Sequence, residues 1–156
     1  MVCMGNICRS PTAEGVLRRK LSDAGLARLV EVDSAGTHGY YSGNPPDPRA
    51  QRHAAKRGYD LSKLRARRVR EEDFERFDLV LAMDDDNLSE LESLRRPDSP
   101  AEVGLLMDHC DGRGRSVPDP YYGDAAGFER VLDDVETACD SLLAHLRQRL
   151  HPGGTS

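Results

Sequence analysis

Residues 2–11 read Val2-Cys3-Met4-Gly5-Asn6-Ile7-Cys8-Arg9-Ser10-Pro11, and this stretch decides how the chain folds around its amino terminus. Gly5 and Asn6 tolerate the unusual dihedral angles that a tight loop needs. In a loop of this length, successive backbone N–H groups converge on one point and form a nest for an anion. A helix that starts directly after the loop adds its positive end to that nest. The stretch therefore predicts an anion-binding loop between a strand and a helix.

The helix after this loop is predicted from its cap. Ser10 is a favourable N-cap and Pro11 occupies the first helical position, so we expect a helix over residues 11–24 that stops at Gly25. Beyond it, short apolar runs typical of buried parallel strands alternate with amphipathic stretches typical of helices. The expected strands are Met1-Val2, Leu29–Val32, Leu79–Met83 and Val103–Met107, and the further helices are one from Asp47-Pro48 to Gly58 and those over residues 70–77, 84–95 and 125–149.

This alternation predicts the fold class. Strands separated by helices indicate an α/β fold, a single-domain doubly wound parallel four-stranded sheet with helices on both faces. We assign residues 1–150 to this domain and residues 151–156 to a disordered tail. In such sheets, ligands bind beyond the carboxyl ends of the strands, so the loops that follow the strands are the first place to look for chemistry.

Composition narrows the class of protein further. The 156 residues carry a formal net charge of −5, which argues against nucleic acid as a partner because phosphate-backbone binders need a basic face. No apolar run reaches the roughly 18 to 20 residues of a membrane span. No basic stretch followed by an apolar run marks a secretion signal. We therefore expect a cytoplasmic protein without a membrane or nucleic-acid partner, and a monomer.

Cys3 stands at the centre of the predicted nest, and Arg9 follows it after five intervening residues. The planar fork of an arginine holds two phosphate oxygens together. A helix amino terminus and an arginine also favour the thiolate form of a cysteine, so we predict that Cys3 attacks the phosphorus of a bound anion. The phosphate-binding residues would be Met4, Gly5, Asn6, Ile7, Cys8 and Arg9. The alternative is that Cys3 is a small buried hydrophobic residue, which is how we interpret Cys110 and Cys139.

Cys8 lies in the same predicted loop, five residues after Cys3. It either fills space in the loop or traps an oxidised Cys3 as a reversible disulfide. We favour the redox role for Cys8, because the two cysteines are so close in sequence.

The opening motif resembles the signature of the low-molecular-weight protein tyrosine phosphatase family, V-C-x-G-N-x-C-R-S-P. Later motifs occur in that family's order at about its spacing: Ser34-Ala35-Gly36-Thr37, Asp47-Pro48-Arg49, Met83-Asp84 and Asp119-Pro120-Tyr121-Tyr122-Gly123. The resemblance covers most of the chain. It implies a protein-tyrosine phosphatase that works through a phosphocysteine, with tyrosine-phosphorylated proteins as substrates and inorganic phosphate as product. It implies neither a metal nor a cofactor.

A phosphocysteine mechanism needs a proton donor for the leaving phenolate and later a base for water. Asp119 matches the position of the family's acid, and Pro120 restricts the loop that carries it. A carboxyl group beside a bound dianion holds its proton more firmly, because like charges repel, so one group can act first as acid and then as base. Without the opening motif, Asp119 would indicate only a turn, as Asp47 does before Pro48.

Substrate specificity is predicted from tyrosines in polar, glycine-rich loops, namely Tyr40, Tyr41, Tyr121 and Tyr122. A deep slot with aromatic walls favours phosphotyrosine over phosphoserine, because the phosphorus of phosphotyrosine lies farther from its backbone. Tyr40 matches a position where the family usually carries an aromatic wall residue. Ile7 stands where relatives that act on phosphoarginine tend to have threonine, which also favours phosphotyrosine. The alternative role for these tyrosines is core packing.

The loop also needs support, since a strained nest costs free energy unless neighbouring contacts fix it. In the family, Asn6, Ser10, Ser34 and Asp84 match polar positions that brace the loop by hydrogen bonds. The alternative is ordinary capping and turn chemistry, and Asp84 could equally be the N-cap of the helix that follows it.

Two features depart from the family's pattern. Leu64 stands where the family commonly has a histidine, which removes part of the bracing network. The family also places a strand of about five residues before the nucleophile, whereas this sequence has only Met1-Val2 there. We therefore hypothesise that the first strand is truncated and that the natural chain carries further apolar residues upstream.

Two other functions share the predicted loop. An arsenate reductase would need two further cysteines close together near the loop, and Cys110 and Cys139 are far apart in sequence. A catalytically inactive anion-binding module is the other alternative. We assign no metal site, because the remaining histidines do not cluster at ligand spacing and the run Asp84-Asp85-Asp86 is interpreted as a helix start.

Overall fold

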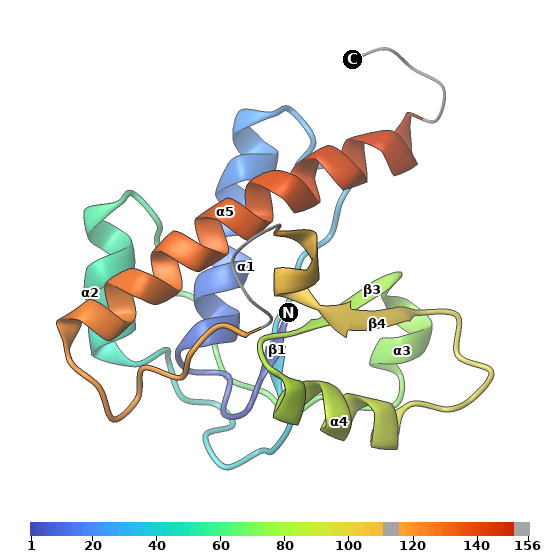
Figure 1. Cartoon of the computed structure of the whole chain (residues 1–156), viewed down its shortest axis with the longest axis horizontal. Coiled ribbons are helices and arrows are strands. Elements are labelled where there is room, and N and C mark those ends of the chain that lie inside the picture. Colours follow the sequence, from blue (N-terminus) through green and yellow to red (C-terminus); the bar gives the residue numbers. More distant parts are fainter. Residues whose placement is uncertain (111–115, 152–156) are drawn as a thin grey trace.

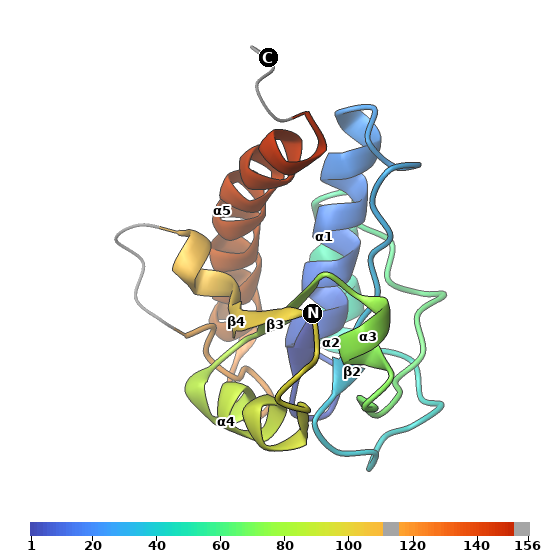
Figure 2. The ribbon, with the colours of Figure 1, turned by 90° about the vertical axis from the view of Figure 1, so that its right-hand side faces the viewer.

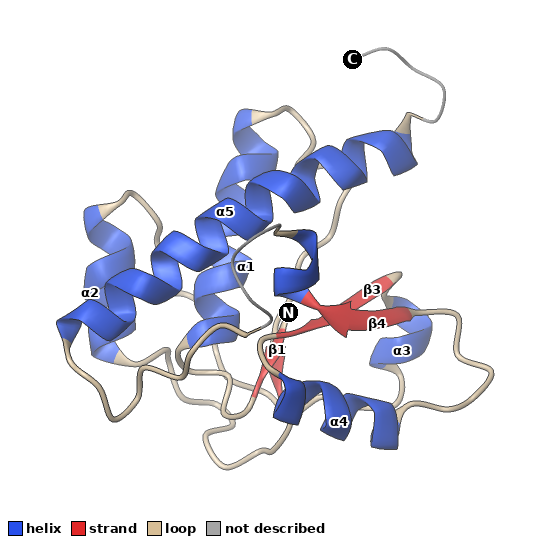
Figure 3. Cartoon of the chain, in the orientation of Figure 1, coloured by secondary structure: helices blue, strands red, loops and turns tan. Residues whose placement is uncertain are grey.

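Four short strands form one parallel sheet in the computed structural model, which describes residues 1–110 and 116–151 (Figures 1 and 3). Across the sheet they run in the order β2 (Ala35–Gly36), β1 (Val2–Cys3), β3 (Leu79–Ala82) and β4 (Glu102–Leu105). The helices are α1 (Arg9–Asp23), α2 (Pro48–Lys56), α3 (Asp73–Arg76), α4 (Asp85–Leu94), the 3₁₀ turn η1 (Leu106–His109) and α5 (Ala125–Leu150). The expected parallel four-stranded α/β sheet is confirmed. From residue 152 on, the predicted tail lies outside the described residues.

Side-chain alternation along the strands explains why helices cover both faces of the sheet. Successive side chains of a strand point to opposite faces. Leu81 and Met83 pack in one hydrophobic cluster with α1 and α5, whereas Val80 and Ala82 pack in another with α3 and α4. In Figures 1 and 2, α5 accordingly lies on one side of the strands and α4 on the other. Among the described residues, no helix is long and apolar enough to cross a membrane, not even the 26-residue α5.

The expected strand at residues 29–32 is wrong. The strand beside β1 is β2, in which Ala35 and Gly36 register with Val2 and Cys3. A strand forms where a neighbouring backbone offers ladder partners, and the ladder with β1 pairs Ala35 and Gly36. Within the described part of the chain, residues 29–34 form no strand and make only one backbone hydrogen bond to the start of the chain, from the Met1 amino group to Asp33 O at 3.2 Å; they line a cavity of about 350 Å³ together with β3.

The start of α1 also differs from the prediction. The helix begins at Arg9 rather than at Pro11, and Cys8 rather than Ser10 occupies the N-cap position. The reason is that the loop winds directly into the helix, so Ser10 lies inside the first turn. There its hydroxyl oxygen is 3.0 Å from the sulfur of Cys3. A residue type that usually caps helices is used here to contact the loop instead.

The other helices begin and end close to their predicted limits. Asp47 caps α2 and Asp84 caps α4, each accepting a hydrogen bond of 2.8 Å from a first-turn backbone N–H. The acidic run at Asp84 is therefore a helix start, as predicted. The expected helix over residues 70–77 is reduced to the single turn α3. The expected strand over Val103–Met107 is β4 as far as Leu105, and its last two residues begin η1.

The carboxyl ends of three strands meet at one edge of the sheet. Cys3 ends β1, Gly36 ends β2 and Met83 follows β3. A Cβ atom on Gly36 would lie 2.7 Å from the carbonyl oxygen of Met4, so a glycine is needed for the chain after β2 to pass this close to the loop. This edge holds the candidate site, in keeping with the rule for doubly wound sheets.

Candidate active site

The loop from Cys3 to Arg9 turns sharply at Asn6. Its φ of 58° lies in the left-handed region, and no other non-glycine residue of the described chain has a positive φ. The Cys8 side chain makes no capping bond to α1, so the first N–H groups of the helix have no cap from it. Uncapped donors at a helix amino terminus are the groups that bind anions. Of the loop side chains, Met4 is exposed, and Asn6, Ile7, Cys8 and Arg9 are buried.

The Asn6 side chain holds the loop through three hydrogen bonds. Its Nδ2 donates to Ser10 Oγ at 2.8 Å and to Ser34 Oγ at 2.9 Å. Its Oδ1 accepts from the backbone N–H of Arg67 at 3.0 Å. The structure thus brings three of the four predicted braces into one buried network. Such bonds offset the strain of a left-handed residue, which is about 1 kcal/mol.

Leu64, where the family commonly has a histidine, packs against the larger hydrophobic cluster. The Arg67 N–H nevertheless supplies a donor to Asn6 from the same segment. The Arg67 guanidinium is itself fixed by Asp73 at 2.9 Å and Asp33 at 3.2 Å. This contribution cannot be predicted from residue type, because a backbone donor can come from any residue.

Cys3 lies at the base of the loop and is 3% exposed. Its sulfur is 3.0 Å from Ser10 Oγ, whereas the next acceptor for that hydroxyl, Ala35 O, is 3.4 Å away. Because Asn6 already donates to Ser10, the single hydroxyl proton of Ser10 is free to point at the sulfur. A donor aimed at the sulfur stabilises a thiolate.

Arg9, the first residue of α1, is buried and held at one end. Its Nη1 donates to Asp84 Oδ2 at 2.5 Å and to the carbonyl oxygen of Val117 at 3.1 Å. Its Nη2 lies 3.8 Å from Asp119 Oδ2. Asp84 therefore both caps α4 and fixes the guanidinium, so the two roles that the sequence left open occur together. A guanidinium fixed at one end presents its other donors to a ligand in a defined direction.

Asp119 is carried by the loop that precedes α5, and its side chain is 41% exposed. The Tyr121 N–H donates to its Oδ1 at 3.1 Å. Upstream, the Val117 N–H donates to Met83 O at 2.7 Å, which ties this loop to the end of β3. The predicted acid is thus brought close to Arg9, although the two are far apart in sequence.

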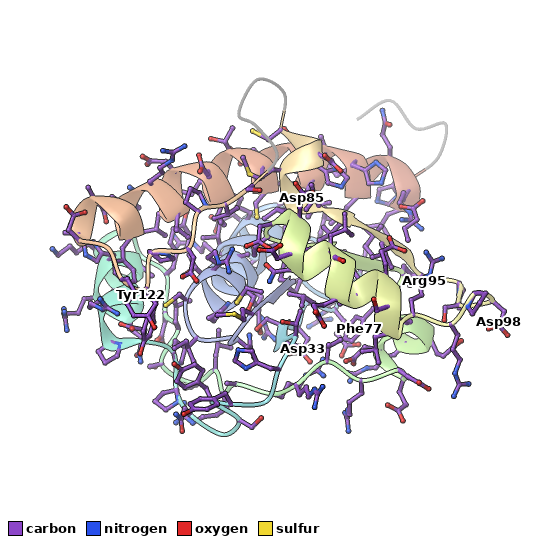
Figure 4. All side chains as sticks on the ribbon, turned by 60° about the horizontal axis from the view of Figure 1, so that its bottom comes forward. Asp33, Phe77, Asp85, Arg95, Asp98 and Tyr122 are labelled. Carbon is purple, nitrogen blue, oxygen red and sulfur yellow. The ribbon has the colours of Figure 1, made fainter. Side chains whose placement is uncertain are left out.

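The four predicted slot tyrosines form a continuous line of rings. Ring centroids are 5.3 Å apart for Tyr40 and Tyr41, 6.5 Å for Tyr41 and Tyr121, and 4.9 Å for Tyr121 and Tyr122. The outer rings of Tyr40 and Tyr122 are exposed, while the inner two are half-buried. Figure 4 shows Tyr122 on the loop that leads into α5. The hydrogen bond with Tyr121, together with burial, raises the pKa of Tyr41 to about 12.

Arg49 has no role in the sequence prediction, yet it supports this line of rings. Its guanidinium carbon lies 5.5 Å from the Tyr121 ring centroid and 4.9 Å from that of Phe128. It also donates to both carboxylate oxygens of Asp47, at 3.1 and 2.8 Å. These bonds lower the pKa of Asp47 below its usual range. The motif Asp47-Pro48-Arg49 supported the family resemblance and indicated a helix start, but it assigned no role to Arg49.

Asn87 of α4 is a second contributor without a predicted role. It is buried, and with its oxygen facing the loop it accepts from the Met4 N–H at 3.3 Å and donates to Asp84 Oδ1 at 3.0 Å. It therefore links the loop to the residue that holds Arg9. An asparagine in the first turn of a helix is ordinary, so the sequence carries no signal for this contact.

Cys8 is buried beside the loop, in a cluster with Ala50, Ala66 and Phe128. Burial, with the nearby charge of Asp47 second, raises the pKa of the Cys8 thiol well above its usual range. Cys3 and Cys8 are both free thiols, and the redox role of Cys8 stays a prediction.

The paired reactive cysteines of an arsenate reductase and the ligand cluster of a metal site are the features that other functions would need. Cys110 and Cys139 are buried in the larger hydrophobic cluster, and burial raises the pKa of Cys139 to about 12. Neither is therefore a reactive surface thiol suited to the disulfide relay of an arsenate reductase. Within residues 1–110 and 116–151, no group of three or more His, Cys, Asp or Glu side chains is placed to hold a metal ion.

Comparison with known proteins supports a single family. A family model described as low molecular weight phosphotyrosine protein phosphatase matches residues 1–151. The low molecular weight protein-tyrosine-phosphatase of Streptomyces coelicolor is 44% identical over 153 residues, covering 96% of this chain and 93% of that one. The low molecular weight phosphotyrosine protein phosphatase of Homo sapiens is 40% identical over 144 residues, covering 91% and 90%. The crystal structure of a protein tyrosine phosphatase from Entamoeba histolytica with Hepes in its active site superposes with a TM-score of 0.91, at 38% identity over 96% of each chain.

Proposed function

Because the chain belongs to the low molecular weight phosphotyrosine protein phosphatase family, we propose that it hydrolyses phosphotyrosine in proteins through a phosphocysteine formed on Cys3. One observation carries the assignment of the residues. The buried Arg9 guanidinium starts the helix next to the Cys3 loop and approaches the Asp119 carboxylate to 3.8 Å. This proximity supports the proposal that nucleophile, anion holder and acid act at one site.

In the first step, the Cys3 thiolate attacks phosphorus in line with the leaving phenolic oxygen. The S–P bond forms as the P–O bond to tyrosine breaks, and Asp119 gives its proton to the departing oxygen. Loop N–H groups and Arg9 hold the equatorial oxygens, whose charge they stabilise in the transition state. Asp84 supports this step by keeping Arg9 in place at 2.5 Å.

In the second step, water attacks the phosphorus of phosphocysteine. Asp119, now ionised, takes a proton from the water, the P–S bond breaks, and inorganic phosphate and the Cys3 thiolate are released. The Ser10 hydroxyl, 3.0 Å from the sulfur, stabilises the departing thiolate. One carboxyl group thus serves both steps.

The tyrosine line supports phosphotyrosine as the substrate class. Tyr40 and Tyr122 are 84% and 95% exposed, so their rings are free to flank an aromatic leaving group above the loop. A phosphoserine brings no ring to stack and its phosphorus is closer to its backbone. We also propose a cytoplasmic location, since Cys3 must stay a free thiol and reducing compartments preserve free thiols.

The test is hydrolysis of p-nitrophenyl phosphate and of matched phosphotyrosine and phosphoserine peptides, in the presence of EDTA. We expect turnover that Cys3→Ser abolishes and that Asp119→Ala lowers in kcat by about 100-fold or more. Asp124→Ala is the matched control, because it is an exposed carboxylate in the same loop whose side chain makes no capping bond. Thioredoxin-dependent arsenate turnover, or tight phosphate binding without turnover, would contradict the proposal.

A further inference from the structure

Glu14 is a buried carboxylate that the mechanism above does not use. It lies in α1 beneath the loop and is 2% exposed. Burying a carboxylate is costly unless hydrogen bonds and charges compensate it. Ser34 Oγ donates to Glu14 Oε1 at 2.7 Å, and the half-exposed Arg18 pairs with Oε2 at 2.7 Å. Both carboxylate oxygens are therefore engaged, and one of them faces the braces of the loop.

A chain of four hydrogen bonds runs from Glu14 to the nucleophile. Ser34 donates to Glu14 at 2.7 Å, and Asn6 Nδ2 donates to Ser34 at 2.9 Å and to Ser10 at 2.8 Å. Ser10 Oγ then lies 3.0 Å from Cys3 Sγ. Glu14, Ser34, Asn6, Ser10 and Cys3 are all buried, so water does not compete for these bonds.

The number of donor protons on each side chain determines which group donates and which accepts in every bond of this chain. A serine hydroxyl has one proton, and an asparagine amide has two. Glu14 accepts a hydrogen bond from the single hydroxyl proton of Ser34, so Ser34 accepts from Asn6. The second amide proton of Asn6 is donated to Ser10, whose own proton is then available for Cys3 Sγ at 3.0 Å, nearer than Ala35 O at 3.4 Å. The Arg67 N–H on Asn6 Oδ1 keeps the amide from reversing.

Without an acceptor at Glu14, the Ser34 hydroxyl proton has no fixed partner, and the donor and acceptor roles along the chain are no longer determined. The Ser34 hydroxyl would then turn its proton toward Asn6, where it meets an amide proton rather than a lone pair. The Asn6 amide would lose one of its two serine partners, and its hold on Ser10 would loosen. The donor at Cys3 therefore depends on a carboxylate that is four hydrogen bonds away.

We propose that Glu14 is a positioning residue for the nucleophile, and that through Ser34, Asn6 and Ser10 its carboxylate keeps a hydroxyl donor directed at Cys3 Sγ. The inference rests on the proposed function, because it takes Cys3 as the attacking group. It adds a residue outside the loop and outside the braces predicted from sequence.

Several charged groups surround Glu14 and affect the pKa of its carboxyl group. Arg18 faces it from α1, Asp33 from the segment before β2, and the amino terminus of Met1 from the start of β1; Figure 4 labels Asp33. Burial raises the pKa of Glu14 above its usual range, against the opposing effects of Ser34 and Arg18. Protonation of Glu14 in acid removes its charge but leaves a carbonyl oxygen that can accept from Ser34, so the acid dependence of Cys3 alkylation should be the same in the wild type and in Glu14→Gln.

The experiment replaces Glu14 by methionine, which has a similar length but no strong acceptor. We expect kcat for p-nitrophenyl phosphate and the rate of Cys3 alkylation by iodoacetate at neutral pH each to fall about tenfold, with KM within about twofold. Glu14→Gln keeps an oxygen that can accept from Ser34 and should restore most of both. The matched control is Asp23→Met on the same helix, which loses an exposed ion pair with Arg19 and should change neither.

A double-mutant cycle with Ser34→Ala separates positioning from general stability. If Glu14 acts through Ser34, the double variant alkylates at the same rate as Ser34→Ala alone. If Glu14→Met fails to fold, Glu14→Asp replaces it, because aspartate keeps the charge but withdraws the oxygen from Ser34 and should show the same loss. A wild-type alkylation rate in Glu14→Met or Glu14→Asp, or losses that multiply in the cycle, would overturn the inference. Absence of wild-type phosphatase activity would instead count against the proposed function, since alkylation is measured independently.

Discussion

Arg9 shows how a single residue is prepared for an anion. Its guanidinium is buried, and Asp84 and the Val117 carbonyl oxygen fix its Nη1. A buried arginine without these partners would be costly in free energy and free to rotate. Asp84 therefore fixes the orientation of the Arg9 guanidinium before a substrate binds, so that less conformational entropy is lost on binding.

We predict that Asp84→Asn lowers kcat/KM for p-nitrophenyl phosphate by roughly 10- to 100-fold. A hydrogen bond to a charged partner contributes about 1.5–3 kcal/mol, and asparagine keeps the N-cap of α4 while losing the charge. Asp86→Asn, on the exposed side of the first turn of α4, is the matched control and should stay near the wild-type value. Steady-state kinetics of the two variants decide the matter, and equal values for both would count against this role of Asp84.

At the scale of elements, α2 is attached to the loop through its cap. The Asp47 N–H donates to Ile7 O at 2.8 Å, and its carboxylate caps α2 and pairs with Arg49. Hydrogen bonds from Arg49 lower the pKa of Asp47. A carboxylate with a depressed pKa in the folded state stabilises the fold above its unfolded pKa, and that stabilisation is lost as the pH falls through the folded pKa.

We predict that the stability difference between the wild type and Asp47→Asn depends on pH in that direction. Asparagine keeps the cap but not the ion pair, so the wild type should be more stable by about 1 kcal/mol above roughly pH 5. The difference should shrink toward zero as the pH falls toward about 3. Thermal unfolding of both proteins between about pH 3 and 7 measures it. A difference that stays constant or grows in acid would rule out the ionised pair as its source.

β2 sets how closely the chain passes the loop. A Cβ on Gly36 would lie 2.7 Å from Met4 O and 2.9 Å from His38 O, and backbone atoms cannot move aside as a side chain can. Gly104 in β4 has no atom within 4 Å of its would-be Cβ. The two glycines thus form a natural pair of test site and control.

We predict that Gly36→Ala lowers the free energy of unfolding by about 1–3 kcal/mol and lowers kcat as well, because the added methyl displaces the loop. Gly104→Ala should leave activity unchanged and stability within about 1 kcal/mol. Urea unfolding and kinetics on both variants test this. Full activity in Gly36→Ala would mean that the approach of β2 to the loop is not needed.

Local chemistry explains which elements could be predicted from the sequence. Caps such as Asp47 and Asp84 mark helix starts because each satisfies nearby N–H groups by itself. Strand limits depend on a distant partner, which is why residues 29–32 were expected as a strand and β2 instead lies at Ala35 beside β1. Ser10 is not the cap because the loop winds directly into a helix that begins at Arg9, which places Ser10 inside the first turn and beside Cys3.

In the candidate site too, some contributions follow from local sequence motifs, whereas others depend on contacts between segments that are distant in sequence. Cys3, Arg9 and Asp119 could be proposed as site residues from the sequence because their motifs combine residue type with spacing, and the structure brings Arg9 to 3.8 Å from Asp119. Arg67 and Asn87 were not, because they act through a backbone N–H and through a contact between α4 and the loop. Such contributions exist only after the sheet has brought separate segments to one edge.

Because the site joins loops from several strands, an anion that binds it should stabilise the entire fold. Binding to the folded state alone contributes about 2.7 kcal/mol at 100 times Kd. For a chain of this size we predict that saturating inorganic phosphate raises Tm by roughly 5–10 °C. Arg9→Met should abolish the rise while leaving a folded protein. Differential scanning fluorimetry measures it, and an equal rise in the variant would place the anion elsewhere.

The central claim is that Cys3 is the ionised nucleophile at an anion-binding loop, and alkylation by iodoacetate followed by peptide mapping tests it most directly. At neutral pH we predict that Cys3 is modified first and far ahead of Cys8, whose pKa burial raises, and that inorganic phosphate protects it. Modification of Cys3 no faster than that of an ordinary thiol, or with the same rate in saturating phosphate, would contradict the account.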